Sequence, residues 1–439
     1  MNYYSTNRSS PLVDFKQATI LGQAPDKGLY FPEQIPQIGM DLIKNIDNYS
    51  QEEIAFRVIR PYTGNTIPEE KLQAILGETL NFRFPLLRLN ENIFSLELFH
   101  GPTLAFKDVG ARFMSRCLGY FLNGLNKKVT VLVATSGDTG GAVAHGFYET
   151  KEVEVVILYP SGKVSPVQEK QLTTLGKNIH ALEIDGSFDD CQRMVKQAFA
   201  DPRVSEKLFL TSANSINVAR WLPQQVYYFF AWKQWPDKDH PPVISVPSGN
   251  FGNICAGILA MKSGLPVKHF IAACNANDVV PKYLQSSNPP AGQAGFKPQT
   301  AVPTLSNAMD VGDPSNFVRV LEIFHQNFHN LKTDLSSYSI SDEETIASIK
   351  EVFRQYHYLL DPHGAVGYLS LQRYLEFHPS EKGIFLETAH PVKFPGAVEQ
   401  STGTSIEIPR PVLEIMGKDK QCIPMKAEYS KLKDYLLGS

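Results

Sequence analysis

Between residues 93 and 274, short runs rich in β-branched residues alternate with stretches of helical periodicity. The short runs are 93–99, 127–135, 153–160, 178–184, 207–212, 242–248 and 267–274, and the helical patterns are 141–149, 164–175, 188–200, 215–232 and 252–263. Such alternation favours parallel sheets with helices on both faces. The units are too many for one small sheet, so we expect an α/β fold with two parallel-sheet lobes.

Helical signals flank this region on both sides. Before it, Ser50 and Glu53 have capping-box spacing, and Pro68 suits the first turn of a second helix. After it, Ser341 and Glu344 form another capping box. The face expected to be apolar in that last helix consists of Ile346, Ile349, Val352, Phe353 and Tyr356.

Composition excludes several classes of function. Lys and Arg total 42 and Asp and Glu total 45, a formal net charge of −3, so no basic field for nucleic acid is expected. No apolar stretch is long enough to cross a membrane, and the N-terminus lacks the apolar core of a secretory signal. The five cysteines form no CxxC pair, which disfavours a disulfide framework or a zinc site and favours a reducing, cytoplasmic location.

Two glycine-rich loops each join a strand to a helix, at 134–142 and 247–253. Glycine allows close backbone approach to a ligand, and the N–H groups of a helix start attract anions. Neither loop has the P-loop or dinucleotide fingerprint. The loops therefore predict two anion sites, although each loop alone is also compatible with an ordinary turn.

Lys107 and Thr388 are further candidates for chemistry. Lys107 lies in HGPTLAFKD, between apolar residues and a helical pattern, where burial would make its amine nucleophilic. The alternative is a lysine whose stem packs and whose amine reaches water. Thr388 ends a strand beside His390, but no second His or Cys lies at ligand spacing, so we expect no metal. The segment 285–300 is either a linker or a loop near a site.

Nine motifs carry a family resemblance, in order along nearly the whole chain: YYSTN, GLYFPE, HGPTLAFKD, SGDTGGA, NSIN, SGNFGN, SNAMD, DPHGAVG and ETAHPVKF. In them the sequence resembles the threonine synthase family, pyridoxal-phosphate enzymes of the tryptophan-synthase-β class, also called fold type II. HGPTLAFKD and SGNFGN together are specific to this branch. One departure is Gly364, where the family pattern more often has threonine.

The resemblance implies a division of the chain and a set of roles. It implies an N-terminal region 1–92, a catalytic region 93–400 with a smaller lobe of roughly 110–215 inserted, and a C-terminal extension 401–439 that packs on the core. Lys107 would carry the cofactor covalently, and Thr388 would bond its pyridine nitrogen. The cofactor phosphate would be wrapped by Gly249, Asn250, Phe251, Gly252 and Asn253.

The same resemblance implies the reaction. The substrate would be O-phospho-L-homoserine, converted to L-threonine and phosphate by a monomer or homodimer. Its carboxylate would be held by Ser136, Asp138 and Thr139. Candidates for its phosphate are Arg112, Arg220 and Lys393, each of which suits a surface ion pair equally well.

Two alternatives stay open. One is a related enzyme of the same fold type, such as a phospho-lyase, an amino-acid dehydratase or a cysteine synthase. The other is a non-catalytic homologue that binds the cofactor, which a chain with Lys107, the whole SGNFGN motif and Thr388 disfavours.

Overall fold

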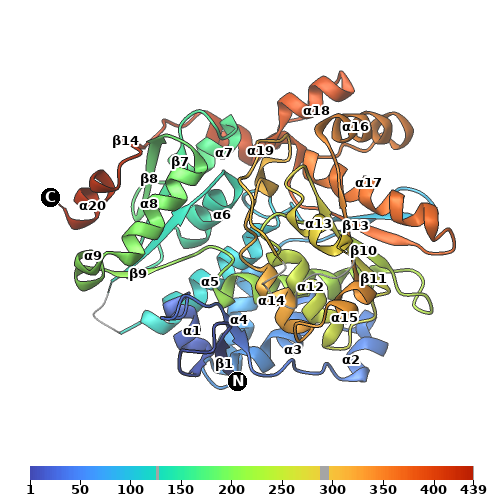
Figure 1. Cartoon of the computed structure of the whole chain (residues 1–439), viewed down its shortest axis with the longest axis horizontal. Helices are drawn as coiled ribbons and strands as arrows, with labels where there is room; N and C mark the ends of the chain where they lie inside the picture. Colours follow the sequence, from blue (N-terminus) through green and yellow to red (C-terminus); the bar gives the residue numbers. More distant parts are fainter. Residues whose placement is uncertain (125–127, 287–295, 439) are drawn as a thin grey trace. The chain divides into compact units, whose positions relative to one another are not determined.

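The computed structural model describes residues 1–124, 128–286 and 296–438 (Figure 1). The chain divides into two compact units, each built from separate stretches. The first unit comprises Met1, Phe31–Phe106 and Trp221–Glu407. The second comprises Asn2–Tyr30, Lys107–Arg220 and Ile408–Ser439. The division inferred from the family resemblance stays a prediction, and most of the segment 285–300 lies outside the described residues.

The first unit is built on a six-stranded sheet of order β12-β11-β10-β13-β5-β4. Only β4, at one edge, is antiparallel to its neighbour, so the expected parallel sheet is confirmed. Its strands are β4 (Leu86–Arg88), β5 (Ile93–Glu97), β10 (Val243–Pro247), β11 (His269–Cys274), β12 (Leu335–Ser339) and β13 (Gly383–Glu387).

Helices α12 (Gly252–Lys262) and α17 (Pro362–Phe377) cover opposite faces of this sheet. The Ser245 hydroxyl donates to the carbonyl of Gly367 in α17. Phe270 lies in register with Ile244, so it points to the other face, where it packs against Gly257 of α12. The strand ends between these two helices are therefore fixed from both sides.

The remaining helices of the first unit surround this layer. They are α2 (Met40–Lys44), η1 (Ile46–Asn48), α3 (Gln51–Thr63), α4 (Glu69–Thr79), η2 (Leu222–Gln225), α11 (Val226–Gln234), α13 (Val279–Gln285), η4 (Asn307–Met309), α14 (Phe317–Ile323), α15 (Phe328–Asp334), α16 (Asp342–Tyr356), η5 (Pro391–Lys393) and α18 (Pro395–Thr402).

The second unit is built on a five-stranded, all-parallel sheet of order β14-β8-β7-β6-β9. Alternate residues of its central strands form an apolar core with helices α8 and α20, which lie along one face (Figure 1). The C-terminal stretch thus supplies both an edge strand and a covering helix. The strands are β6 (Val129–Ala134), β7 (Val153–Pro160), β8 (Ile179–Asp185), β9 (Phe209–Thr211) and β14 (Ile423–Lys426).

A small N-terminal hairpin also belongs to the second unit, and β3 (Tyr30–Pro32) and α10 (Val218–Trp221) lie where the chain passes between units. The hairpin strands are β1 (Asn2–Ser5) and β2 (Val13–Asp14). The helices are α1 (Phe15–Leu21), α5 (Lys107–Leu122), α6 (Asp138–Phe147), α7 (Pro166–Thr173), α8 (Phe188–Ala200), α9 (Pro202–Lys207), α19 (Arg410–Met416) and α20 (Tyr429–Leu437).

Both predicted capping boxes are confirmed, at α3 and α16. The predicted helix 215–232 is wrong as one element: Pro223 interrupts it, and α10, η2 and α11 follow one another there. Pro68 is the residue before α4 rather than in its first turn.

The predicted apolar face of α16 is wrong at Ile346, whose side chain is 43% exposed. The buried face keeps the predicted Ile349 and Val352 and adds Thr345 and Ser348. Thr345 tolerates burial because its hydroxyl donates to the carbonyl of Ser341, 2.8 Å away.

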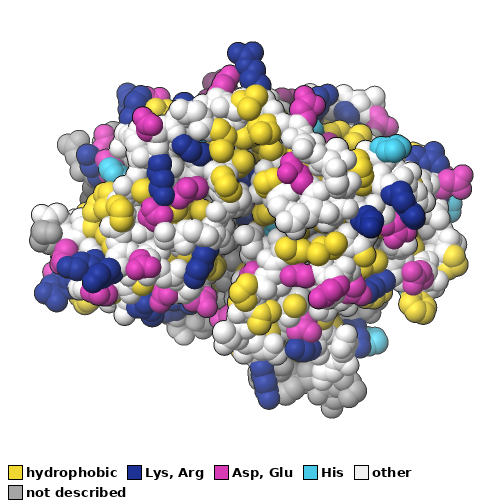
Figure 2. Space-filling model, turned by 90° about the horizontal axis from the view of Figure 1, so that it is seen from above, with side chains coloured by type: hydrophobic (Ala, Val, Ile, Leu, Met, Phe, Trp, Pro, Cys, Tyr) yellow, Lys and Arg dark blue, Asp and Glu magenta, His cyan; other side chains and the backbone are white. Residues whose placement is uncertain are grey.

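Charges on the surface are mixed. On the face drawn in Figure 2, basic and acidic side chains are interspersed rather than gathered by sign, as the small net charge leads one to expect. Within the described part of the chain, no helix is both long enough and apolar enough to span a membrane.

Candidate active site

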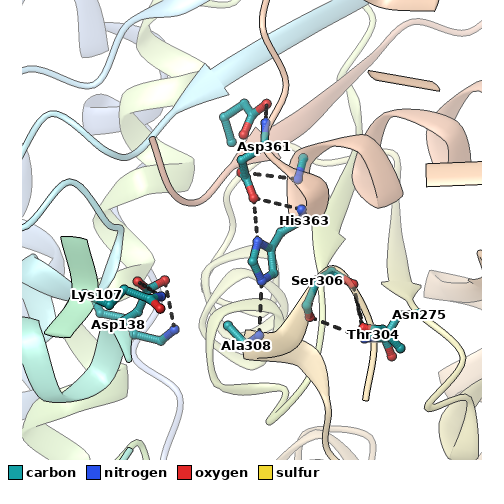
Figure 3. A network of polar contacts seen from close by, with 11 residues as sticks. Lys107, Asp138, Asn275, Thr304, Ser306, Ala308, Asp361 and His363 are labelled. Carbon is teal, nitrogen blue, oxygen red and sulfur yellow. Dashed lines mark hydrogen bonds and ion pairs between the residues drawn. The ribbon is translucent and has the colours of Figure 1, made fainter. Parts of the chain in front are cut away.

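Lys107 is the first residue of α5 in the second unit, and its amine faces a buried carboxylate (Figure 3). The Lys107 Nζ lies 3.8 Å from Oδ2 of Asp138, and the two side chains are 17% and 3% exposed. Gln168 donates its amide N–H to the other Asp138 oxygen at 2.9 Å. A primary amine with little solvent access, held by a fixed anion, suits covalent chemistry with an aldehyde.

The loop that leads into α6 is closed by its own side chains. The Thr135 hydroxyl accepts the N–H groups of Gly137 at 2.9 Å and Gly140 at 2.8 Å. Gly137 has φ 134°, and a Cβ there would lie 2.4 Å from the Gln168 side chain, so only glycine fits. Ser136 and Thr139 remain partly exposed, whereas Asp138 is buried.

The loop that leads into α12, in the first unit, lacks such closure. Phe251 precedes the helix with φ 61°, an unusual conformation for an aromatic residue, and no side chain caps the helix start. The side-chain oxygen of Asn253 accepts a hydrogen bond from the Tyr228 hydroxyl at 2.9 Å. Its amide nitrogen is buried and has no hydrogen-bond partner among the described residues. These donors fit the phosphate of a cofactor, which would supply the missing acceptor.

Gly249 and Asn250, in the same loop, contact the rest of the first unit. A Cβ on Gly249 would lie 2.7 Å from Cα of Met309, so the loop and the turn at 306–310 touch through their backbones. Asn250 is exposed, and its side-chain oxygen accepts the N–H of Ser315 at 3.3 Å.

Thr388 follows β13 directly and is 5% exposed. Its carbonyl accepts the N–H of Phe106 at 2.9 Å, and Lys107 is the next residue of the chain. In the described part of the structure the Thr388 hydroxyl makes no hydrogen bond. A buried hydroxyl that can donate or accept suits a pyridine nitrogen.

The three basic candidates lie in different surroundings. Lys393 is fully buried and donates to the carbonyl of Thr103 at 2.8 Å. Arg220 is 2% exposed and donates to the carbonyl of Ala213. Arg112 lies on α5 and keeps partial exposure. Arg112 and Arg220 belong to the second unit and Lys393 to the first.

Sequence reasoning missed a buried network of acids and imidazoles near the strand ends of the first unit. Burial alone would raise the pKa of Asp361, but its pairing with His363 holds that pKa below the usual value. Burial, and then the neighbouring Asp361, raise the pKa of Glu387 well above its usual value. These opposite shifts favour the neutral form of Glu387 and the anionic form of Asp361.

The same network explains Gly364. A Cβ at this position would lie 2.3 Å from the Glu387 carboxyl group, so the carboxyl fills the room that a side chain would need. The only sequence signal for the network was the spacing of Asp361 and His363 at a helix start beside a proline.

Comparisons with known proteins cover the entire chain. Residues 77–386 match the family model of pyridoxal-phosphate dependent enzymes, residues 2–80 the threonine synthase N terminus, and residues 364–436 the threonine synthase C-terminal model. The chain is 45% identical to threonine synthase of Haemophilus influenzae and 43% identical to that of Escherichia coli, covering 100% of each chain in both cases.

Solved structures agree. The crystal structure of threonine synthase from Escherichia coli matches with a TM-score of 0.92 at 41% identity, over 100% of both chains. The structure of threonine synthase from Brucella melitensis with bound pyridoxal phosphate matches with a TM-score of 0.91 at 35% identity, over 99% of this chain and 98% of that one.

Proposed function

This chain belongs to the threonine synthase family of pyridoxal-phosphate-dependent enzymes, and on that premise we propose how its residues share the reaction. Its cofactor is pyridoxal phosphate and it is a lyase of threonine biosynthesis. The proposed substrate is O-phospho-L-homoserine, and the proposed products are L-threonine and phosphate. The Lys107 amine, 3.8 Å from buried Asp138, carries this proposal.

When bound, the cofactor withdraws electrons from the substrate carbon that loses its proton. The groups that fit it are the Lys107 amine for covalent attachment, the Asn253 amide for its phosphate, and the Thr388 hydroxyl for its ring nitrogen. Gly249, Asn250, Phe251 and Gly252 would add backbone contacts to the phosphate. A neutral hydroxyl does not hold a proton on the ring nitrogen as a carboxylate would, which restrains carbanion chemistry that ends in the wrong product.

Lys107 also moves protons. With the cofactor and substrate bound, the Lys107 amine would take the α-proton of the substrate and later return protons to it. Asp138 stabilises the resulting ammonium, because opposite charges about 4 Å apart attract strongly in a site that excludes water. Gln168 keeps Asp138 oriented through its hydrogen bond.

The substrate is held at its two charged ends. Ser136 and Thr139, which remain partly exposed, offer hydroxyl groups to its carboxylate. The Asp138 side chain accepts but cannot donate, so its contribution to carboxylate binding is its backbone N–H. For the substrate phosphate we favour Arg112, since Arg220 and Lys393 are buried and donate to backbone carbonyls.

The test is incubation of the purified protein with pyridoxal phosphate and O-phospho-L-homoserine, with threonine and phosphate both measured. Equal amounts of the two products support the proposal. Release of phosphate with 2-oxobutyrate in place of threonine identifies a phospho-lyase that does not control hydration. Binding of pyridoxal phosphate without formation of any product from the substrate would favour the non-catalytic alternative.

A cytoplasmic location and a monomer or homodimer also belong to the proposal. Size-exclusion chromatography with light scattering measures the mass of the protein in solution, for comparison with the 49.0 kDa of one chain. A mass above two chains contradicts the second point.

A further inference from the structure

A hydrogen-bonded path within the first unit leads from the start of α17 to the turn at 306–310 (Figure 3). Asp361 caps α17 by accepting the N–H of His363 at 2.8 Å, and it also accepts Nδ1–H of the same imidazole at 2.5 Å. The imidazole Nε2 accepts the N–H of Ala308 at 3.2 Å. Both side chains are almost fully buried, at 0% and 2% exposure.

This geometry fixes the state of the imidazole. Nε2 carries a lone pair, because it accepts a backbone N–H, and Nδ1 carries the proton, because it faces a carboxylate. Phe394 packs on the ring with centroids 4.9 Å apart and restricts its rotation. His363 is therefore held in one orientation, with Nε2 as an acceptor aimed at one backbone N–H.

That N–H belongs to a turn that touches the loop before α12. Met309, the next residue, is 3% exposed and packs on Ala273, Ile340 and Val366. Its backbone lies where a side chain at Gly249 would be, as described above. The turn thus contacts His363 through Ala308 and Gly249 through Met309.

We propose that His363 is a positioning residue for the cofactor phosphate: through Ala308 it fixes the 306–310 turn, and through the turn it fixes the loop at Gly249–Asn253. This inference rests on the proposed function, because it assumes that this loop holds the phosphate. Asp361 orients the ring through its bond to Nδ1–H. Loss of the acceptor at Nε2 leaves the partly buried Ala308 N–H without its partner and loosens the turn.

A matched pair of variants separates the two ends of the imidazole. In His363→Asn the amide sits near the position of Nδ1, so it can still bond Asp361 but cannot reach Ala308. In His363→Gln the amide reaches the position of Nε2 and restores the acceptor. His269→Asn serves as a control, because His269 is also a buried imidazole of the first unit and bonds Thr333 and Ser336 instead.

The measurement is the affinity of each variant for pyridoxal phosphate and for pyridoxal, which lacks the phosphate. Losing one hydrogen bond should weaken pyridoxal phosphate binding of His363→Asn by about five- to tenfold. Pyridoxal binding should change little, and His363→Gln should recover most of the loss. The 31P resonance of the bound cofactor should shift in His363→Asn and return toward the wild-type position in His363→Gln.

Other outcomes overturn the inference. Equal losses of both ligands in His363→Asn, or a loss of the same pattern in His269→Asn, would mean a general effect on the fold. If His363→Asn does not fold, His363→Gln decides alone: a lowered ratio of pyridoxal phosphate to pyridoxal affinity contradicts the account. The wild-type protein tests the phosphate loop itself. If it binds pyridoxal phosphate no more tightly than pyridoxal, the proposed phosphate loop is refuted before any variant is made.

Discussion

The two glycine-rich loops look alike in sequence but are completed in different ways. In the second unit, Thr135 satisfies the N–H groups of its loop, and Asp138 is held by Lys107 and Gln168. In the first unit, the loop before α12 has no side-chain cap, and the Asn253 amide nitrogen lacks a partner among the described residues. The loop of the second unit is completed by its own protein side chains, whereas we propose that the loop of the first unit is completed by a ligand, the cofactor phosphate. Stability and cofactor affinity should therefore respond differently to changes in the two loops.

The largest effect is expected at Lys107. Lys107→Ala removes both the attachment point and the proton carrier, so threonine formation should fall on the order of a thousandfold or more. The phosphate loop is untouched, so the variant should still bind pyridoxal phosphate without a covalent bond. The readouts are the rate of threonine formation and cofactor fluorescence. Retention of full activity would remove Lys107 from the mechanism.

In the ligand-completed loop, Asn253→Asp replaces the unpartnered donor with an acceptor that repels phosphate. Pyridoxal phosphate affinity should fall by about ten- to a hundredfold, whereas pyridoxal affinity changes little. Titration with both aldehydes measures the difference. Unchanged phosphate preference would mean that the loop does not hold the phosphate.

In the self-completed loop, Thr135→Val leaves two buried N–H groups without an acceptor. The free energy of unfolding of the cofactor-free protein should fall by about 2–4 kcal/mol, as measured by denaturant titration. Thr135→Ser keeps the hydroxyl and should lose about 1 kcal/mol, the value of its methyl group. If Thr135→Val instead keeps its stability and loses phosphate preference, the contrast between the loops is wrong.

The smallest effect is expected from the charge state of Glu387, in the first unit. Glu387 has a raised pKa, so it is protonated in the folded chain and ionised in the unfolded chain once the pH exceeds about 4.5. The stability that protonated Glu387 contributes is therefore progressively lost as pH rises above that value toward the raised pKa.

Glu387→Gln keeps the neutral donor and removes the titration. Its stability relative to wild type should rise as the pH goes from 5 to 6, by at most about 1.4 kcal/mol. Glu414→Gln, on the exposed surface of α19, serves as the control. Parallel curves for wild type and Glu387→Gln would show that Glu387 is ionised in the fold.

Much of the fold could be predicted because strands and helices leave local signals. Runs such as 153–160 and capping pairs such as Ser341 with Glu344 depend on nearby residues only, and both are found where expected. Strand β12, with the sequence LSSYS, was missed because its polar residues carry no apolar pattern. It forms a strand because its backbone pairs in parallel with β11 at the edge of the sheet.

The candidate site was predictable to a lesser extent. Lys107 and the two loops could be found from motifs, but the pairing of Lys107 with Asp138 depends on how α5 packs on α6, which no local pattern encodes. The bond from His363 to Ala308 joins segments 55 residues apart. The need for Gly364 became visible only once the Glu387 carboxyl group was located beside it.

The most direct test of the account is to trap the cofactor with borohydride and map the modified peptide by mass spectrometry. The account predicts one modified residue, Lys107, with labelling that saturates at one cofactor per chain. A label on another lysine, or none at saturating pyridoxal phosphate, would contradict it.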